Sequence, residues 1–349
     1  MPSILAVSTA APPHRIPQEA IKREFGRLVA GLPHVERLMP VFDRSGVEAR
    51  HLIHEPAWYL EERSWDERNR EYQVRALELA EAAVRRCLEA SGLTASDIDH
   101  FYFVTTTGLA TPSLDALLAG RLGMKPTIRR YPLFGLGCAA GAGALARATD
   151  VLEARPNDVA LVVSVEICSL VFSKEARTPT DLVGVALFGD GAAAAVLAGD
   201  GTGRRGVRVL GTETRLFADA KHLMGWDFTS DGMRLVLARE IPEVVRDTIA
   251  PVARAFTRRF GKDVREFTHH VLHPGGPKVM ATYRSAFDLP EEALGIARRC
   301  MREFGNLSSA AVLFMLSDLT SSGRPQAGDT GLVLALGPGF GAELLVLEW

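Results

Sequence analysis

A cysteine, a histidine and an asparagine stand in sequence contexts that suit acyl transfer, although they lie far apart in the chain. Cys138 belongs to the run Gly-Leu-Gly-Cys-Ala at 135–139, whose small residues permit a sharp turn and let a substrate approach the sulfur. The alanine-rich run that follows is typical of a helix, so we expect Cys138 to open one. Because free backbone N–H groups at a helix start favour an anion, the sequence predicts a lowered thiol pKa and a nucleophile for reversible acyl loading.

The alternative interpretation of Cys138 is a small side chain buried in a Gly/Ala-packed helix, and the Gly-x-Gly-Cys turn favours the catalytic one. Cys87 and Cys300 lie in helix-like stretches, where we expect them to pack. Cys168 follows a strand-like segment and is interpreted as a packing residue too, with contact to the cavity, shared with Glu166, as the alternative. The four cysteines form no Cys-x-x-Cys pair, so the sequence predicts neither a metal site nor a disulfide framework.

His273 and Asn306 are the candidate partners of the cysteine. His273 begins the run His-Pro-Gly-Gly-Pro at the end of a strand-like segment, a position from which a side chain can project into a cleft. Asn306 lies in Gly-Asn-Leu-Ser-Ser at 305–309, and taken alone it is equally well explained as a helix N-cap. An internal repeat of the chain favours a catalytic role, because it places Asn306 opposite Cys138.

The segments that must position these residues alternate between strand-like and helix-like, which predicts an α/β fold with mostly parallel sheets. In the first half we expect a buried N-terminal strand, an amphipathic helix at 71–90, a strand at 100–105, a helix at 138–153 and strands at 158–165 and 192–197. The second half repeats this plan with a strand at 267–272, a helix from 306 and a strand at 331–336. The offset of about 170 residues indicates a duplication, with coincidence among α/β segments as the alternative.

No Pro- or Ser-rich linker separates the two repeats. We place the join near residue 205, in the glycine-rich run at 201–206. This divides the chain into an N-terminal half, 1–205, with the cysteine and a C-terminal half, 206–349, with the histidine and the asparagine. The same run is also compatible with a surface loop inside one compact unit.

Composition narrows the class of protein. The chain has 349 residues, of which 47% are hydrophobic and 23% charged, as in an ordinary globular enzyme. A formal net charge of −2 argues against nucleic acid as a partner. No apolar run is long enough to predict a transmembrane helix, and the N-terminus lacks the features of a signal peptide. With unpaired cysteines, these features lead us to expect a cytoplasmic protein.

Five motifs, in order along nearly the whole chain, resemble the type III polyketide synthases, the chalcone-synthase-like enzymes. The resemblance is to their bacterial alkylpyrone and alkylresorcinol synthases, and it implies the thiolase fold, a duplicated five-layered αβαβα sandwich, and a homodimer. His-Pro-Gly-Gly-Pro and Gly-Pro-Gly are the more specific elements. The motifs lie at 135–139, 187–192, 273–277, 305–309 and 337–341.

The resemblance implies iterative decarboxylative condensation of malonyl-CoA onto an acyl-CoA starter. In it, Cys138 carries the acyl chain, His273 keeps the thiolate ionised, and His273 and Asn306 together stabilise the enolate formed as CO2 leaves. It implies no metal and no cofactor, with coenzyme A only as carrier. Arg37 and Arg44 match a basic stretch that the family uses for the CoA phosphates, and a solvated charged surface is the alternative for both.

The resemblance also bears on specificity. Phe188 matches a gatekeeping phenylalanine, Leu235 replaces a second aromatic ring of the plant enzymes, and Thr111 stands where those enzymes place a methionine that reaches the partner subunit. Smaller side chains favour an apolar tunnel, so we expect a long-chain fatty acyl starter and an alkylpyrone or alkylresorcinol product. Starter length, number of extensions, mode of ring closure and delivery by CoA or acyl carrier protein stay open. The other expected substrate-binding residues are Thr106, Glu166, Cys168, Gly276 and Ser308.

Three rival functions fit parts of the pattern. A ketoacyl synthase of the fatty-acid type shares the three residues and the fold, but it condenses once, takes its substrate from acyl carrier protein and has a different histidine motif. A papain-like cysteine protease has the same chain order of Cys, His and Asn, but the surround of its cysteine is absent here. A non-enzymatic scaffold is the third, if Cys138 is inert.

Overall fold

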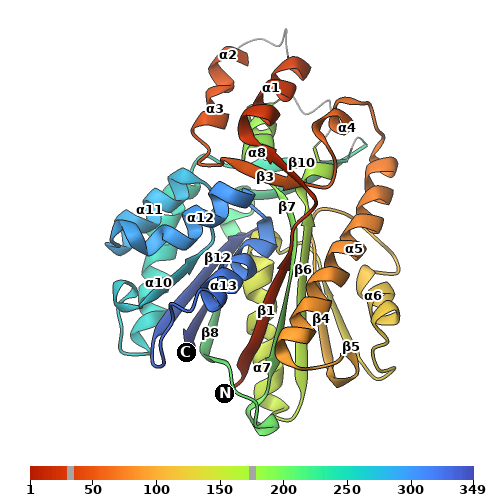
Figure 1. Ribbon diagram of the computed structural model, residues 1–349. Helices are drawn as coiled ribbons and strands as arrows, with labels where there is room; N and C mark the ends of the chain where they lie inside the picture. Colours follow the sequence, from red (N-terminus) through yellow and green to blue (C-terminus); the bar gives the residue numbers. More distant parts are fainter. Residues whose placement is uncertain (30–34, 173–177, 231) are drawn as a thin grey trace.

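The computed structural model describes residues 1–29, 35–172, 178–230 and 232–349. Its centre is a nine-stranded sheet in the order β11-β12-β13-β8-β1-β7-β6-β4-β5 (Figure 1). The predicted α/β class is confirmed. The strands are β1 (Ser3–Ala10), β4 (His100–Val104), β5 (Arg129–Leu133), β6 (Val159–Ile167), β7 (Asp190–Ala198), β8 (Val207–Leu216), β11 (His269–Leu272), β12 (Thr330–Gly337) and β13 (Gly341–Glu348).

The prediction of mostly parallel sheets is wrong, because the sheet is mixed. Of its strand pairs, β4–β5, β4–β6 and β11–β12 are parallel, and the others are antiparallel. One reason is visible between β12 and β13, where the short connection Pro338–Phe340 has no room for the crossover that a parallel pair needs.

The sheet repeats one topology twice. In the first half, β4 runs parallel to β6, β6 antiparallel to β7, and β7 antiparallel to β1. In the second half, β11, β12, β13 and β8 pair in the same way, and β1 meets β8 at the centre. The predicted duplication is therefore present in the fold. The run at 201–206 lies between β7 and β8, but the sheet continues across it through the β1–β8 pair, so the division of the chain at 205 stays a prediction.

The repeat extends to a pair of partly buried interactions. His100 at the start of β4 lies 2.9 Å from the carboxylate of Asp158, and His269 at the start of β11 lies 3.0 Å from that of Asp329. Both aspartates immediately precede the adjoining parallel strand. Equivalent side chains thus hold equivalent strand pairs in both halves.

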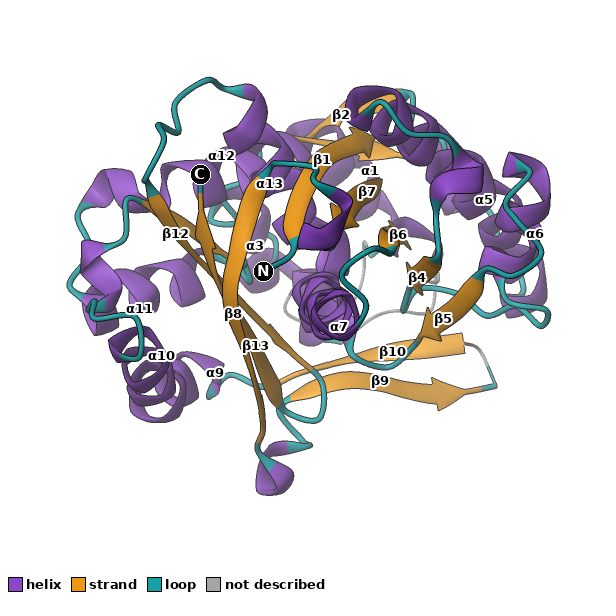
Figure 2. Cartoon of the chain, turned by 90° about the horizontal axis from the view of Figure 1, so that it is seen from below, coloured by secondary structure: helices purple, strands orange, loops and turns teal. Residues whose placement is uncertain are grey.

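The helices complete the layers (Figure 2). α7 (Ala140–Ala154) and α13 (Ala311–Ser321) contact each other in the middle, and α7 lies with β8 and β13 on one side and β4 and β6 on the other. The outer helices are α5 (Trp65–Ser91) and α6 (Leu114–Leu122) in the first half, and α10 (Ala250–Arg258), α11 (Pro277–Phe287) and α12 (Gly295–Phe304) in the second. The helix expected at 71–90 begins six residues earlier, because Ser64 and Glu67 form a capping box there.

β7 shows how the sequence separates two cores. Its side chains alternate between the two faces of the sheet. Ala192 and Ala194 belong to the cluster that includes residues of α5, whereas Ala193 and Ala195 belong to the cluster around α7 and α13. Small side chains on both faces let the helices approach closely from either side.

The remaining elements gather above one end of the sheet and along its side (Figure 1). The hairpin β9–β10 lies beside β5 and below α7 in Figure 2. None of the helices in the described parts is both long and apolar enough to cross a membrane. The elements outside the central sheet and its helix layers are β2 (His14–Pro17), β3 (Ala49–Leu52), β9 (Met224–Thr229), β10 (Gly232–Leu237), α1 (Gln18–Leu28), α2 (Val35–Leu38), α3 (Pro40–Asp43), α4 (Pro56–Leu60), α8 (Pro179–Leu187) and α9 (Ile241–Val244). A π-helical turn, Val245–Ile249, continues α9.

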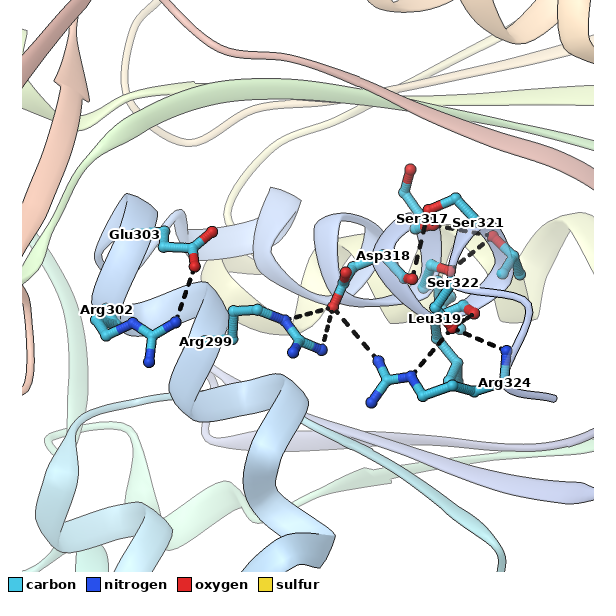
Figure 3. Close-up of polar contacts among 11 residues, drawn as sticks. Arg299, Arg302, Glu303, Ser317, Asp318, Leu319, Ser321, Ser322 and Arg324 are labelled. Carbon is cyan, nitrogen blue, oxygen red and sulfur yellow. Dashed lines mark hydrogen bonds and ion pairs between the residues drawn. The ribbon is translucent and has the colours of Figure 1, made fainter.

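An ion pair joins α12 and α13, the two helices that flank the Asn306 segment in the chain (Figure 3). Asp318 of α13 accepts hydrogen bonds from Arg299 of α12 at 3.0 and 2.7 Å, and Arg324 lies 3.8 Å from the same carboxylate oxygen. This ion pair holds together the two helices between which Asn306 lies.

Candidate functional site

Cys138 lies in a tight turn rather than at the first residue of a helix. A 3₁₀ turn, Gly137–Ala139, precedes α7, which begins at Ala140. Gly137 has φ +49°, and a Cβ on it would lie 2.4 Å from Pro338 Cδ, so only glycine fits. The predicted helix start at Cys138 is therefore wrong by two residues, because an alanine-rich pattern does not distinguish a 3₁₀ turn from a helix.

The second half contains the matching turn. Ser308–Ala310 forms a 3₁₀ turn before α13, and Ser308 has φ +50°. Ser308 therefore corresponds to Gly137, and Ser309 corresponds to Cys138. The expectation that Asn306 stands opposite Cys138 in the repeat is wrong, because the helix expected from Asn306 begins only at Ala311. A serine held in the left-handed region is strained, and the hydroxyl of Ser308 faces the thiol of Cys138.

The thiol of Cys138 is buried and donates a hydrogen bond to Ser308 Oγ at 3.5 Å. Burial raises its pKa to about 12, although the Ser308 hydroxyl lowers the pKa in part, because it can donate to the thiolate once the proton is lost. This differs from the lowered pKa expected from the sequence. The cause is desolvation, a tertiary property that outweighs the neighbouring helix start.

His273 follows β11 directly. Its backbone N–H donates to Leu334 O at 2.8 Å, which continues the β11–β12 pairing to this residue. The side chain is buried, Nδ1 has no hydrogen-bond partner among the described residues, and burial lowers the pKa of His273 to about 4. The imidazole is therefore neutral near pH 7 and able to accept a proton.

Asn306 is held by its backbone and by one side-chain atom. Its N–H donates to Leu187 O at 2.7 Å, and its Oδ1 accepts from the backbone N–H of Ser308 at 2.9 Å. Because that donor can only meet the amide oxygen, the NH2 group points elsewhere. Nδ2 makes no hydrogen bond with the residues that the structure describes, so both of its hydrogens are available to a ligand.

One cavity brings these three side chains together. It holds about 510 Å³ of empty space, part of it open to solvent. Of the expected substrate-binding residues, Thr106, Phe188, Leu235 and Ser308 line it as well. The structure thus unites the three catalytic candidates, which the sequence separates by up to 168 positions between Cys138 and Asn306.

Trp226 also lines this cavity, and sequence reasoning missed it. It stands directly opposite Leu235 in the β9–β10 register, and its Nε1 donates to Thr106 Oγ1 at 3.1 Å. The indole therefore occupies space beside the smaller Leu235. A tryptophan in a polar run at 226–231 was the available signal, but only the strand register pairs it with Leu235.

Glu166 does not line the cavity but stands behind it, fully buried at the end of β6. Its carboxylate accepts from Thr106 N at 3.1 Å and Thr107 Oγ1 at 2.9 Å, and also from Ser309 Oγ. Burial raises the pKa of Glu166 to about 7, while these donors lower the pKa in part. Ser309, the repeat counterpart of Cys138, thus connects Glu166 to the turn that carries Ser308.

Three more expected substrate-binding residues lie outside the cavity lining. Cys168 is buried in the turn after β6, where burial raises its thiol pKa well above the ordinary value. Thr111 is exposed. Gly276 is buried with φ +131°, and the nearest atom to an added Cβ is Leu187 Cδ1 at 3.7 Å. None of these three residues lines the cavity, so the structure does not place them where substrate contact was expected.

Arg37 and Arg44 lie on the surface of the α2–α3 segment. In the described part of the chain neither forms an ion pair or a side-chain hydrogen bond. Exposed, unpaired guanidinium groups suit phosphate, but they are equally compatible with a solvated surface. Within the described ranges, no group of three or more His, Cys, Asp or Glu could hold a metal ion.

Comparison with known proteins identifies the class. The model of chalcone and stilbene synthases, N-terminal domain, matches residues 1–201, and the corresponding C-terminal domain matches residues 210–349. The chain is 41% identical to 1,3,6,8-tetrahydroxynaphthalene synthase of Streptomyces peucetius subsp. caesius over 99% of this chain and 93% of that one. It is 34% identical to a putative chalcone synthase of Bacillus subtilis (strain 168), over 100% and 99%.

Solved structures agree with this class. The crystal structure of 1,3,6,8-tetrahydroxynaphthalene synthase from Streptomyces coelicolor A3(2) superposes with a TM-score of 0.95 at 30% identity, over 99% of both chains. A fungal type III polyketide synthase shares the fold, with a TM-score of 0.91 at 24% identity over 99% of both chains. The chain belongs to the chalcone and stilbene synthase family and is a type III polyketide synthase, an acyltransferase with the thiolase fold.

Proposed function

We propose that this enzyme extends an acyl group held on Cys138 by successive decarboxylative condensations with malonyl-CoA. The observation that carries the proposal is the meeting, in one cavity, of a cysteine thiol, a neutral histidine and an asparagine amide with free hydrogens. A ketoacyl synthase needs the same three groups, but the family match leads us to prefer repeated condensation on CoA thioesters.

Loading is general-base catalysis. Because burial keeps both Cys138 and His273 neutral, the thiol proton moves to His273 as the sulfur attacks the thioester carbonyl. A bond forms between Sγ and the carbonyl carbon, and the bond from that carbon to the CoA sulfur breaks. CoA leaves with the proton that His273 received.

Extension uses His273 and Asn306 as hydrogen-bond donors. Malonyl-CoA places its thioester oxygen against the one N–H of the neutral His273 imidazole and against Asn306 Nδ2–H, which stabilise the enolate as the C–CO2 bond breaks. The enolate carbon attacks the acyl carbonyl on Cys138, and the thiolate leaves. The lengthened chain is then on CoA, and it returns to Cys138 for the next cycle.

We infer that malonyl-CoA is the preferred candidate for the starter. Two relatives named for tetrahydroxynaphthalene synthesis support it, since that product is a compact aromatic. Trp226 supports it as well, because its indole fills space next to the smaller Leu235 and leaves a cavity suited to a short acyl group.

A long-chain fatty acyl starter, closing to an alkylpyrone or alkylresorcinol, is the second candidate. Leu235 favours it, since this residue is smaller than the aromatic side chain of the plant enzymes and lines the cavity. If this candidate is correct, Leu235→Trp shortens the preferred starter. An unchanged chain-length profile in that variant counts against it.

We further infer that Arg37 and Arg44 bind the CoA phosphates.

We also infer that two copies of the chain form a dimer through the side that carries Phe134 and Phe228. These two rings are 45% and 58% exposed and lie 6.4 Å apart. Phe134 follows β5, the edge strand of the sheet. Delivery of the starter by acyl carrier protein stays open.

The test is incubation of the purified chain with radiolabelled malonyl-CoA, alone and with acyl-CoA starters from acetyl to palmitoyl. A polyhydroxylated aromatic from malonyl-CoA alone supports the first starter, and long-chain pyrones or resorcinols support the second. Cys138→Ala must abolish both. A single condensation that requires acyl carrier protein would overturn the proposal in favour of a ketoacyl synthase.

A further inference from the structure

Each condensation leaves a negative charge on Sγ of Cys138. The charge enters on the malonyl carboxylate and passes to the enolate as CO2 leaves. It ends on Sγ when the enolate carbon bonds to the acyl carbonyl carbon and the C–S bond breaks. A neutral imidazole has one N–H, which His273 gives to the enolate oxygen, and Asn306 donates to the same oxygen. Because Cys138 is buried, the thiolate needs a hydrogen-bond donor of its own.

Ser308 is the side chain that meets this sulfur. Its Oγ lies 3.5 Å from Sγ of Cys138 and accepts a hydrogen bond from the thiol in the resting site. Ser308 Oγ donates to no group among the described residues, so its own hydrogen is free. A hydroxyl hydrogen turns about the C–O bond, and the hydroxyl can therefore donate to the sulfur once the sulfur is an anion. A hydrogen bond to a charged acceptor is stronger than one between neutral groups.

The backbone holds the Ser308 hydroxyl against the sulfur. Ser308 has φ +50°, which few residues other than glycine adopt, and its N–H donates to Asn306 Oδ1 at 2.9 Å. The next residue, Ser309, lies 2.8 Å from Ser164 through their hydroxyl oxygens. The turn also packs closely on α7, because a Cβ on Gly141 would lie 2.1 Å from Ser309 O. The hydroxyl is thus in place before charge develops on the sulfur.

We propose that Ser308 is a catalytic residue that donates its hydroxyl hydrogen to the Cys138 thiolate as this thiolate leaves in each condensation. The inference rests on the proposed function, because it needs an acyl group on Cys138 and an enolate derived from malonyl-CoA. The same bond assists loading, in which the thiol proton goes to His273 while charge develops on Sγ. The pKa of Cys138 agrees with this role, since the Ser308 hydroxyl lowers it against the effect of burial.

The fate of the enolate tests the proposal. Each enolate either attacks the acyl group on Cys138 or takes a proton to become acetyl-CoA, so a poorer leaving thiolate diverts it to acetyl-CoA. The enzyme is acylated with CoA thioesters from acetyl to palmitoyl, mixed with malonyl-CoA labelled at C2 and quenched. We expect Ser308→Gly to lower the ratio of extended product to acetyl-CoA about tenfold or more, as for one hydrogen bond to a charged group. The matched control Ser321→Gly, which removes an exposed hydroxyl at the end of α13, should keep the parent's ratio.

Two variants separate the hydroxyl from the strained backbone. Glycine adopts φ +50° without strain and alanine does not, but Ser308→Gly and Ser308→Ala both lack the hydroxyl. We expect the same fall in product ratio in both, and alkylation of Cys138 by iodoacetamide about tenfold slower than in the parent at pH 8. An unchanged ratio in Ser308→Gly, or a fall in Ser308→Ala only, would overturn this inference alone. Absence of acylation in the parent with every thioester would overturn the proposed function as well.

Discussion

The thiol of Cys138 donates a hydrogen bond at 3.5 Å to Ser308 Oγ, so the two halves of the repeat meet at this cysteine. A donating thiol is protonated, in agreement with the pKa of about 12 that burial gives Cys138. Ser308 is able to accept this bond because its turn holds the same left-handed conformation as the turn of Cys138, with φ +50° against +49° at Gly137. We therefore expect the Cys138 thiol to lose its proton only as it reacts.

The reactivity of the free thiol follows from this burial. We expect alkylation of Cys138 by iodoacetamide to accelerate about tenfold per pH unit from about pH 7 to 10, because the thiolate fraction rises in that way below the thiol pKa. Mass spectrometry of the Cys138 peptide measures the rate, with Cys138→Ala as control. A rate already at its plateau near pH 7 would instead indicate a preformed thiolate–imidazolium pair with His273.

Glu166 makes stability depend on pH. Its folded pKa of about 7 lies above the ordinary value of 4.5, so its contribution to stability is complete at acid pH and is lost as pH rises through 7. The loss is on the order of 3 kcal/mol at alkaline pH. Glu166→Gln should flatten the dependence of Tm on pH between about 4.5 and 7, the interval between the unfolded and folded pKa values. Asp190, whose pKa burial raises to about 6, acts in the same sense at slightly lower pH and remains in the variant.

Trp226 should set the size of the starter. Trp226→Ala removes an indole from the cavity wall, so we expect kcat/KM for an octanoyl starter to rise about tenfold relative to acetyl. Trp226→Phe keeps a ring but loses the bond to Thr106, and it should keep the selectivity of the parent enzyme. If the alanine variant shows the parent's preference, the indole does not limit the cavity.

Arg44 should recognise the phosphates of coenzyme A rather than the acyl group. Arg44→Ala is expected to raise KM for malonyl-CoA on the order of fivefold, the value of one exposed ionic contact. It should leave the reaction with the N-acetylcysteamine thioester, which has no phosphate, unchanged. Arg205→Ala, in an exposed loop, is the control. Equal losses with both thioesters would assign Arg44 a structural role instead.

Much of the site could be predicted from the sequence because its residues lie in short, conformationally demanding runs. The glycine turn around Cys138, the His-Pro-Gly-Gly-Pro run of His273 and the Gly-Asn run of Asn306 all lie in contexts that local patterns reveal. Trp226 was missed because its place depends on strand register, and the pKa of Cys138 was misjudged because burial is a property of the whole fold.

The repeat illustrates the same limit. Apolar periodicity located the strands and central helices of both halves, but it did not separate 3₁₀ turns from helix starts. Matching the two halves by their predicted helix starts therefore pairs Cys138 with Asn306, whereas the 3₁₀ turns pair it with Ser309. The direction of the strand pairs was also missed, since alternating segments suggest crossovers where β12 and β13 form a hairpin.

Peptide mapping of the acyl-enzyme tests the central claim most directly. The chain is quenched with acid seconds after mixing with acyl-CoA thioesters from malonyl to palmitoyl, digested and examined by mass spectrometry. We expect the acyl mass on the peptide that contains Cys138, none in Cys138→Ala, and slower appearance in His273→Ala. An acyl group on Cys168, or product formation with Cys138 replaced, would contradict the assignment of Cys138 as the acyl carrier.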